Sequence, residues 1–261
     1  MVLTSHQLLA DIILAQPRIA IAVSGGVDSM TLATFANMVA PNRTEMLHAV
    51  SPAVQPTATV RVRDAARVQN WHLTVTGTGE FDDPRYRDNP VNRCYFCKTN
   101  LYDRICSLTA APIASGANLD DLGEYRPGLL AASEHDVLHP FVDAGMAKSD
   151  IRTLARELGL DDVAELPAQP CLASRIETGI AIDPKDLAFV DSIEGYLSNE
   201  LGLRGDVRCR ITKSGVIIEL PESEITTEIQ ARIAERCKMN DRAFMGLRPY
   251  QRGAMFIQDQ S

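Results

Sequence analysis

The first half of the chain alternates short apolar runs with segments of helical periodicity. The runs are rich in Ile and Val and end at small or polar residues, a pattern typical of buried parallel strands. They cover residues 18–24, 45–51, 72–78, 112–117 and 136–141. Helical spacing of apolar residues marks segments 4–16, 30–40 and 59–70, with Thr4 and Ser5 as candidate N-caps of the first. This alternation predicts an α/β fold with a doubly wound, mostly parallel sheet.

The second half changes character after residue 165. Residues 148–160 still predict a helix of the sheet domain, with Ser149 as its cap and Gly159 just past its end. A proline-containing loop without periodicity follows, and Asp183 with Pro184 then opens a helix to about residue 201. Residues 206–212 alternate as a strand, and a second strand, a helix and a terminal segment complete a small α+β domain. The predicted organisation is a nucleotide-binding domain (1–165), a loop (166–182) and a second domain (183–261).

Composition narrows the class of protein. The 261 residues are 45% hydrophobic and 23% charged, as in ordinary globular proteins. A formal net charge of −8 disfavours nucleic acid as a partner. The apolar stretches are too short to span a membrane, and the N-terminal segment lacks the basic region and cleavage site of a signal peptide. We therefore expect a cytoplasmic protein that does not act at a membrane.

The sequence SGGVDS, Ser24 to Ser29, lies between a predicted buried strand and a predicted helix. Glycines at such a turn let backbone N–H groups approach an anion closely, and the helix dipole favours phosphate there. The stretch resembles the PP-loop of the ATP pyrophosphatases, which cleave ATP between the α- and β-phosphates. The resemblance implies ATP binding, with Asp28 supporting the loop or Mg²⁺; the alternative is a tight turn without a ligand. The candidate ATP-binding residues of this stretch are Ser24, Gly25, Gly26, Val27, Asp28 and Ser29.

Polar residues follow two further predicted strands. Ser51, in HAVSP, lies where this superfamily frames the adenine ring. Gly116 lies at the end of the strand predicted at 112–117, and Asn118, Asp120 and Asp121 follow it. These residues should emerge at the carboxyl edge of the sheet, where open α/β folds bind ligands. Taken alone, this stretch could equally be a surface turn.

Cysteines and arginines supply the remaining candidate chemistry. Cys94 and Cys97 form a single CxxC, which fits half a metal site, a redox pair or coincidence. Cys171 lies in a proline-bounded loop four residues before Arg175, whose charge could favour the thiolate, although loop cysteines are more often inert. Arg208 and Arg210 share one strand face and could clamp a phosphate or carboxylate; a solvated strand face is the alternative. The other cysteines fall within apolar patterns and are expected to pack in the interior: Cys106, Cys209 and Cys237.

Together these motifs resemble the LarE family of ATP-dependent sacrificial sulfur transferases. The resemblance rests on the ordered motifs SGGVDS, HAVSP, RCYFCK, GANLDDLGEYRPG, CLASR and VRCR, which span about residues 5–225. It implies an adenine nucleotide alpha hydrolase-like fold and a homo-oligomer, a hexamer in the family. It also implies a pyridinium mononucleotide substrate, bound by Arg208, Arg210 and Ser174, and catalysis by Cys171 and Arg175. ATP and Mg²⁺ are the expected cofactors.

The resemblance implies a reaction in two stages. ATP adenylylates a carboxylate of the substrate, and sulfur then converts it to a thiocarboxylate for the nickel-pincer nucleotide. The sulfur source stays open: Cys171 itself, leaving dehydroalanine, or a [4Fe-4S] cluster held by Cys94, Cys97 and Cys171. Two other functions also stay open, an amidotransferase-type ligase that delivers ammonia and a non-enzymatic adenine-nucleotide sensor.

Overall fold

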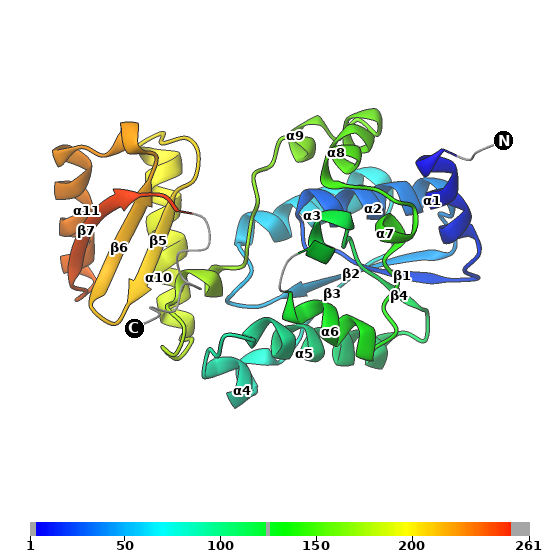
Figure 1. Cartoon of the computed structure of the whole chain (residues 1–261), viewed down its shortest axis with the longest axis horizontal. Coiled ribbons are helices and arrows are strands. Elements are labelled where there is room, and N and C mark those ends of the chain that lie inside the picture. Colours follow the sequence, from blue (N-terminus) through cyan, green and yellow to red (C-terminus); the bar gives the residue numbers. More distant parts are fainter. Residues whose placement is uncertain (1–3, 124–125, 252–261) are drawn as a thin grey trace. The chain divides into compact units, whose positions relative to one another are not determined.

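The computed structural model describes residues 4–123 and 126–251, so Glu124 and Tyr125 of the motif GANLDDLGEYRPG lie outside the described residues. The chain forms two compact units (Figure 1). Unit 1 comprises Met1–Asp83 and Asn92–Gln169, and unit 2 comprises Pro84–Val91 and Pro170–Ser261. The sequence pattern did not indicate that Pro84–Val91 belongs with the second unit.

Unit 1 is an α/β unit built on a four-stranded sheet. Its strands are β1 (Ile19–Ala22), β2 (Thr44–Val50), β3 (Leu73–Gly77) and β4 (Ile113–Ala114). Its helices are α1 (Ser5–Leu14), α2 (Val27–Val39), α3 (Pro56–Gln69), α5 (Arg93–Leu108), α6 (Pro127–Glu134), α7 (Pro140–Asp143), α8 (Lys148–Glu157) and α9 (Asp161–Ala164), with short 3₁₀ turns η1 (Glu80–Asp82) and η2 (Leu119–Gly123).

The sheet has the order β3-β2-β1-β4, and all its strand pairs are parallel. This confirms the predicted parallel α/β sheet. The predicted strand at 136–141 is wrong, because only Leu138 makes an isolated bridge, to Ala114, and α7 begins at Pro140. Proline lacks the N–H that a central strand must donate, so the run cannot continue as a strand.

Both faces of the sheet are covered by helices, which explains why β1 is apolar without alternation. Successive side chains of a strand point to opposite faces. Ile19 and Ile21 pack in the larger core with α1, α2, α3 and α8, whereas Ala20 packs in a smaller core with α5 and α6. Figure 1 shows α2, α3 and α8 on one side of the sheet and α5 and α6 on the other.

Helix caps were predicted with mixed success. Thr4 caps α1, because its side chain accepts the N–H of Gln7 while Gln7 accepts the N–H of Thr4. Ser149 does not cap α8: the N-cap is Ala147, whose N–H donates to the Asp150 carboxylate at 2.8 Å. An acidic side chain three residues into the helix thus replaces the expected hydroxyl.

Unit 2 is a small α+β unit, as predicted, with a mixed three-stranded sheet of order β5-β6-β7. Strand β6 is antiparallel to β5 and parallel to β7. Its elements are α4 (Pro84–Arg87), η3 (Leu172–Arg175), α10 (Pro184–Gly195), the π-helical η4 (Tyr196–Glu200), β5 (Arg208–Thr212), β6 (Gly215–Leu220), η5 (Glu222–Glu224), α11 (Thr227–Met239) and β7 (Phe244–Pro249).

The interior placement of three cysteines is only partly confirmed. Cys209 and Cys237 are buried in unit 2, whereas Cys106 is exposed on α5 of unit 1. The apolar residues around Cys106 in the sequence belong to another face of the helix, because residues i+1 and i+2 do not share a face with residue i.

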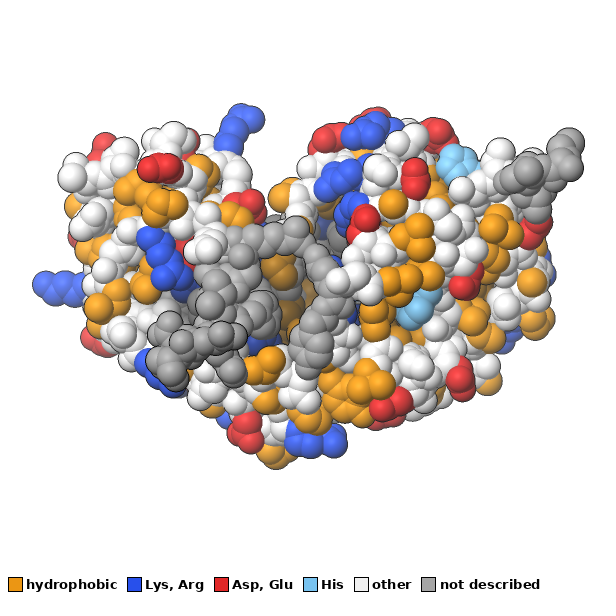
Figure 2. All heavy atoms as spheres, viewed as in Figure 1, with side chains coloured by type: hydrophobic (Ala, Val, Ile, Leu, Met, Phe, Trp, Pro, Cys, Tyr) orange, Lys and Arg blue, Asp and Glu red, His pale blue; other side chains and the backbone are white. Residues whose placement is uncertain are grey.

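Two surface properties bear on function. Among the described residues, no helix combines the length and the apolar character that crossing a bilayer requires. On the faces visible in Figure 2, basic and acidic side chains are interspersed within each unit.

Candidate functional site

The SGGVDS stretch forms a closed loop at the start of α2. Gly25 has a φ of +87°, which favours glycine, and Gly26 is the N-cap of the helix. The backbone N–H of Ser24 donates to Ser29 Oγ at 3.0 Å, and Ser29 Oγ donates to the Gly26 carbonyl at 3.2 Å. The first N–H groups of a helix have no partner within it, and the helix dipole is positive there. Such a loop can accept an anion, and we call residues 24–29 the cradle.

Two glycines allow other backbone segments to approach this cradle closely. A Cβ on Gly25 would lie 2.9 Å from the carbonyl oxygen of Ala58, in the first turn of α3. A Cβ on Gly116 would lie 2.8 Å from the backbone nitrogen of Ser29. The predicted residues after β1 and after β4 are thus brought together, and any larger side chain at either glycine would push the segments apart.

Asp28 forms an ion pair with a residue that the sequence analysis did not single out. Lys148 Nζ, from the first turn of α8, lies 2.5 Å from Asp28 Oδ2. Burial raises the pKa of Asp28, and the ammonium group of Lys148 opposes that rise. Among the described residues, Asp28 Oδ1 is buried without a hydrogen-bond partner. A carboxylate oxygen of this kind fits a hard cation such as Mg²⁺.

The connection after β4 is held by its own polar side chains. Asp121 Oδ2 accepts the backbone N–H of Asn118 at 3.1 Å, and Asp121 Oδ1 pairs with Arg126 at 2.9 Å. Asp120 accepts the backbone N–H of Lys148 at 2.8 Å, which ties this connection to α8. Ser51, directly after β2, uses its hydroxyl to accept the N–H of Ala53. Asp121 and Ser51 therefore shape the loops at the sheet edge.

Sequence reasoning also missed two side chains that fix the loop from α3 and β2. Arg61 Nη1 donates to the Gly25 carbonyl at 2.7 Å. His48 is fully buried, with Nδ1 2.7 Å from the Val23 carbonyl and Nε2 2.9 Å from Thr59 Oγ1. Burial lowers the pKa of His48, so the neutral ring donates from Nδ1 to the carbonyl. In the sequence, His48 lies within an apolar strand and is the first residue of the motif HAVSP, and neither feature indicates the contacts of its side chain.

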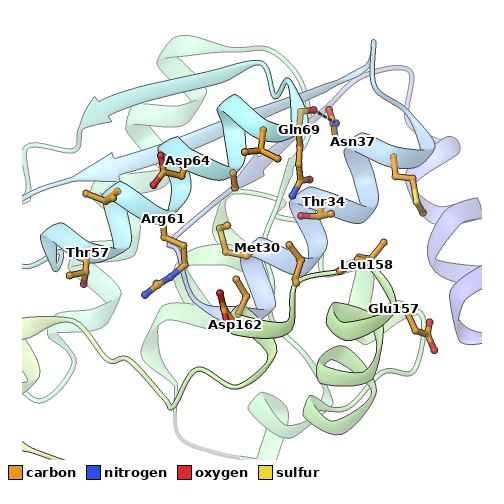
Figure 3. Close-up of a pocket in the computed structure, with 17 residues that line it drawn as sticks. Met30, Thr34, Asn37, Thr57, Arg61, Asp64, Gln69, Glu157, Leu158 and Asp162 are labelled. Carbon is orange, nitrogen blue, oxygen red and sulfur yellow. Dashed lines mark hydrogen bonds between the residues drawn. The ribbon is translucent and has the colours of Figure 1, made fainter. Parts of the chain in front are cut away.

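An open groove on unit 1 lies between α2, α3 and the segment joining α8 to α9 (Figure 3). Its volume is about 870 Å³, and Met30, Thr34 and Leu158 are among its lining residues. None of the predicted ATP-binding residues lines it. Arg61, which lines this groove, also donates to the Gly25 carbonyl of the SGGVDS loop.

The segment carrying Cys171 is fixed within unit 2 by Arg175. Arg175 is buried, and its Nε and Nη2 atoms each donate at 2.9 Å to the carboxylate of Glu194. Its Nη1 donates to the carbonyl oxygens of Pro170 and Cys171. Cys171 itself is exposed. The guanidinium therefore holds the backbone of this segment, and Glu194 neutralises the charge that was expected to favour the thiolate.

The predicted substrate-binding residues lie together in unit 2. Arg210 donates to the carbonyl oxygen of Ser174 at 3.0 Å and pairs with Glu219 at 2.8 Å. Arg208 pairs with Asp206 at 2.9 Å. Both arginines are buried, so the alternative of a solvated strand face is wrong.

Cys94 and Cys97 lie in the first two turns of α5, three residues apart and therefore on one face of the helix. They belong to unit 1, whereas Cys171 belongs to unit 2. Within the described residues, no three His, Cys, Asp or Glu side chains are grouped as metal ligands. Thiolates remain the donors that iron–sulfur clusters take.

Comparison with known proteins gives the chain a family. No family model matches it. It is 38% identical over 221 residues to the uncharacterized protein slr1717 of Synechocystis sp., a match covering 82% of this chain and 80% of the relative. The chain belongs to the same family as slr1717. It is also 28% identical over 209 residues to MJ0830 of Methanocaldococcus jannaschii, covering 78% of each chain.

A third relative has a named activity. The pyridinium-3,5-bisthiocarboxylic acid mononucleotide synthase of Lactiplantibacillus plantarum is 28% identical over 230 residues. The match covers 86% of this chain and 79% of the relative. The matched stretch is longer than unit 1 or unit 2 alone, so the chain described here resembles the synthase in both units.

Proposed function

We propose that the chain is an ATP-dependent sulfur transferase that converts a carboxylate of a pyridinium mononucleotide into a thiocarboxylate, a step in making a nickel-pincer nucleotide. The observation that carries the proposal is the similarity to the Lactiplantibacillus plantarum synthase, which extends over both units. The anion cradle at the start of α2 supports it, since ATP presents phosphates to such a site.

The proposed first stage activates the substrate. A carboxylate oxygen attacks the α-phosphorus of ATP, the bond to the β-phosphate breaks, and pyrophosphate leaves. In this stage the N–H groups of the cradle would bind the phosphates, and the ion pair of Asp28 and Lys148 would lie beside them. Mg²⁺ held by Asp28 would neutralise phosphate charge. This stage is needed because a free carboxylate has no leaving group that a thiolate could displace.

The proposed second stage transfers sulfur. The thiolate of Cys171 attacks the acyl carbon and AMP leaves, giving a thioester. Removal of the Cα proton of Cys171 then breaks its Cβ–S bond, leaving sulfur on the substrate and dehydroalanine in the protein. If Cys94, Cys97 and Cys171 instead hold a [4Fe-4S] cluster, that group would supply a transferable sulfide. We propose that the protein is a homo-oligomer, as the family resemblance implies, and that it is cytoplasmic.

The test combines the purified protein with ATP, Mg²⁺ and the pyridinium dicarboxylate mononucleotide. We expect substrate-dependent release of pyrophosphate and AMP, and a thiocarboxylate product detected by mass spectrometry. Cys171→Ala should keep pyrophosphate release and lose the thiocarboxylate, whereas Cys106→Ala, which removes another exposed thiol, should keep both. An amide product would instead identify a ligase, and nucleotide binding without pyrophosphate release would identify a sensor.

The sulfur source is decided in the same assay under anaerobic conditions. A protein without iron that turns over once and loses the mass of H₂S uses Cys171 as the sulfur donor. A protein whose bound iron and repeated turnover are both lost in Cys94→Ala and Cys97→Ala uses a cluster. Cys106→Ala, on the same helix as these two cysteines, is the matched control.

A further inference from the structure

Arg61 contacts two parts of unit 1 that the proposed reaction uses at different stages. Its Nη1 atom donates to the carbonyl oxygen of Gly25 at 2.7 Å and to Gln169 Oε1 at 3.2 Å. Gly25 belongs to the nucleotide cradle. Gln169 is the last residue of unit 1 and lies two residues before Cys171 in the chain. One guanidinium group therefore connects the cradle to the end of unit 1.

We propose that Arg61 is a positioning residue that couples nucleotide binding at the cradle to the segment leading to Cys171. The inference rests on the proposed function, because it assumes that ATP occupies the cradle and that Cys171 reacts. It goes further by assigning a role to a residue that touches neither reacting group.

The base of the Arg61 side chain is well fixed. Ala58, one turn earlier on α3, lies so close to Gly25 that no Cβ fits between them. Thr59 is bonded through the ring of His48 to the carbonyl oxygen of Val23. The start of α3 is therefore packed against the cradle and bonded to the chain directly after β1, and Figure 3 shows Arg61 extending from this helix on the side away from Asp64.

The charge of Arg61 also suits a link to an anion site. Among the residues that the structure describes, no carboxylate forms an ion pair with Arg61. An uncompensated cation beside the Gly25 carbonyl attracts a phosphate bound at the cradle. A bound anion would attract the guanidinium group of Arg61 and so change the strength of its hydrogen bond to Gln169. Such coupling is reciprocal, so the state of the Gln169 contact must also alter nucleotide affinity.

The experiment measures the reactivity of Cys171 in the whole protein. Iodoacetamide is added with and without α,β-methylene ATP, which resists cleavage at the proposed bond, and alkylation is followed by peptide mass spectrometry. Exposed Cys106 on α5 is the internal reference. We expect nucleotide to change the alkylation rate of Cys171 by about fivefold in the wild type. Arg61→Gln should abolish this change and weaken nucleotide binding by about tenfold, because it removes a charged donor.

The variants separate coupling from binding. Gln169→Ala removes only the second contact of Arg61, so it should abolish the change at Cys171 while nucleotide binding stays within about fivefold of wild type. Gln169→Glu should keep the change at Cys171, because a carboxylate also accepts from the guanidinium, but it should weaken nucleotide binding, because it neutralises the charge of Arg61. Arg67→Gln removes the same charge from an exposed position of α3 and should behave as wild type.

Three outcomes would overturn the proposal. In the first, Gln169→Ala responds to nucleotide as the wild type does. In the second, the wild type binds nucleotide but Cys171 reactivity does not change; sulfur transfer would then still stand as the proposed function. In the third, the wild type does not bind nucleotide at all, which refutes both the coupling and the proposed function.

Discussion

Substituting Gly116 by alanine tests the close approach of the β4 exit to the first turn of α2. The added Cβ would lie 2.8 Å from the backbone nitrogen of Ser29 and 2.9 Å from the carbonyl carbon of Asp28, whereas ordinary contacts are 3.4–4 Å. Both neighbours are backbone atoms, so no side-chain rotation relieves the clash. One segment must move by several tenths of an ångström, and overpacking of this kind costs about 1–3 kcal/mol.

The displacement falls on the part of α2 whose N–H groups form the cradle. We therefore expect Gly116→Ala to lower the urea midpoint of unit 1 and to weaken ATP binding by about tenfold, since about 1.4 kcal/mol corresponds to one decade. Trp71 is the single tryptophan of the chain and is buried in the larger core of unit 1, so its fluorescence reports that unit. Calorimetric titration with ATP measures the affinity.

Gly77→Ala is the matched control at the end of β3. The added Cβ would lie 3.9 Å from the carbonyl oxygen of Val50, which is an ordinary contact. We expect this variant to keep the urea midpoint and the ATP affinity of the wild type. If Gly116→Ala unfolds and binds ATP as Gly77→Ala does, the inferred contact between the β4 exit and α2 is wrong.

Three further predictions concern charge and exposure. Burial raises the folded-state pKa of Asp28 above its ordinary value of 3.8, so the free energy of unfolding should fall as the pH rises from 3.8 through the folded-state pKa. Lys148→Met removes the charge that opposes this rise, so the fall should be deeper and extend to higher pH. Urea midpoints of the variant that keep the wild-type pH dependence would contradict this prediction. Glu194→Gln leaves the charge of Arg175 buried without its anionic partner, so the free energy of unfolding of unit 2 should fall by about 3 kcal/mol. Hydrogen exchange of the β5 amides measures this loss, and unchanged protection would refute the prediction. Cys106 should react with iodoacetamide in the native protein, and complete protection would show that it is buried.

Local patterns were sufficient to predict most of unit 1. Apolar runs, helical spacing and the glycine pair each act over a few residues, so β1, the cradle and α2 could be placed from the sequence. The strand expected at 136–141 was wrong because an apolar run was given more weight than Pro140. The exposure of Cys106 was missed for a related reason: hydrophobic neighbours in sequence are not neighbours on a helix face.

The polar contacts of the cradle could not be predicted in this way. Asp28 and Lys148 are 120 residues apart, and Arg61 lies 36 residues from Gly25. Each basic residue lies on a helix whose pattern fits an ordinary solvated face. Only the folding of α3 and α8 against the same loop brings these residues together, and no sequence spacing predicts it.

Neutralisation of charge also decides what the arginines of unit 2 can do. Glu219 is fully buried and accepts hydrogen bonds from both Arg210 and Arg248. One carboxylate between two guanidinium groups leaves one positive charge, and the side chain of Arg248 is 42% exposed whereas that of Arg210 is 7% exposed. The pair Arg208 and Asp206 adds no net charge. An anionic substrate reaching β5–β7 would therefore be attracted by a cluster whose accessible member is Arg248, with Arg210 holding Glu219 and the segment of η3 in place.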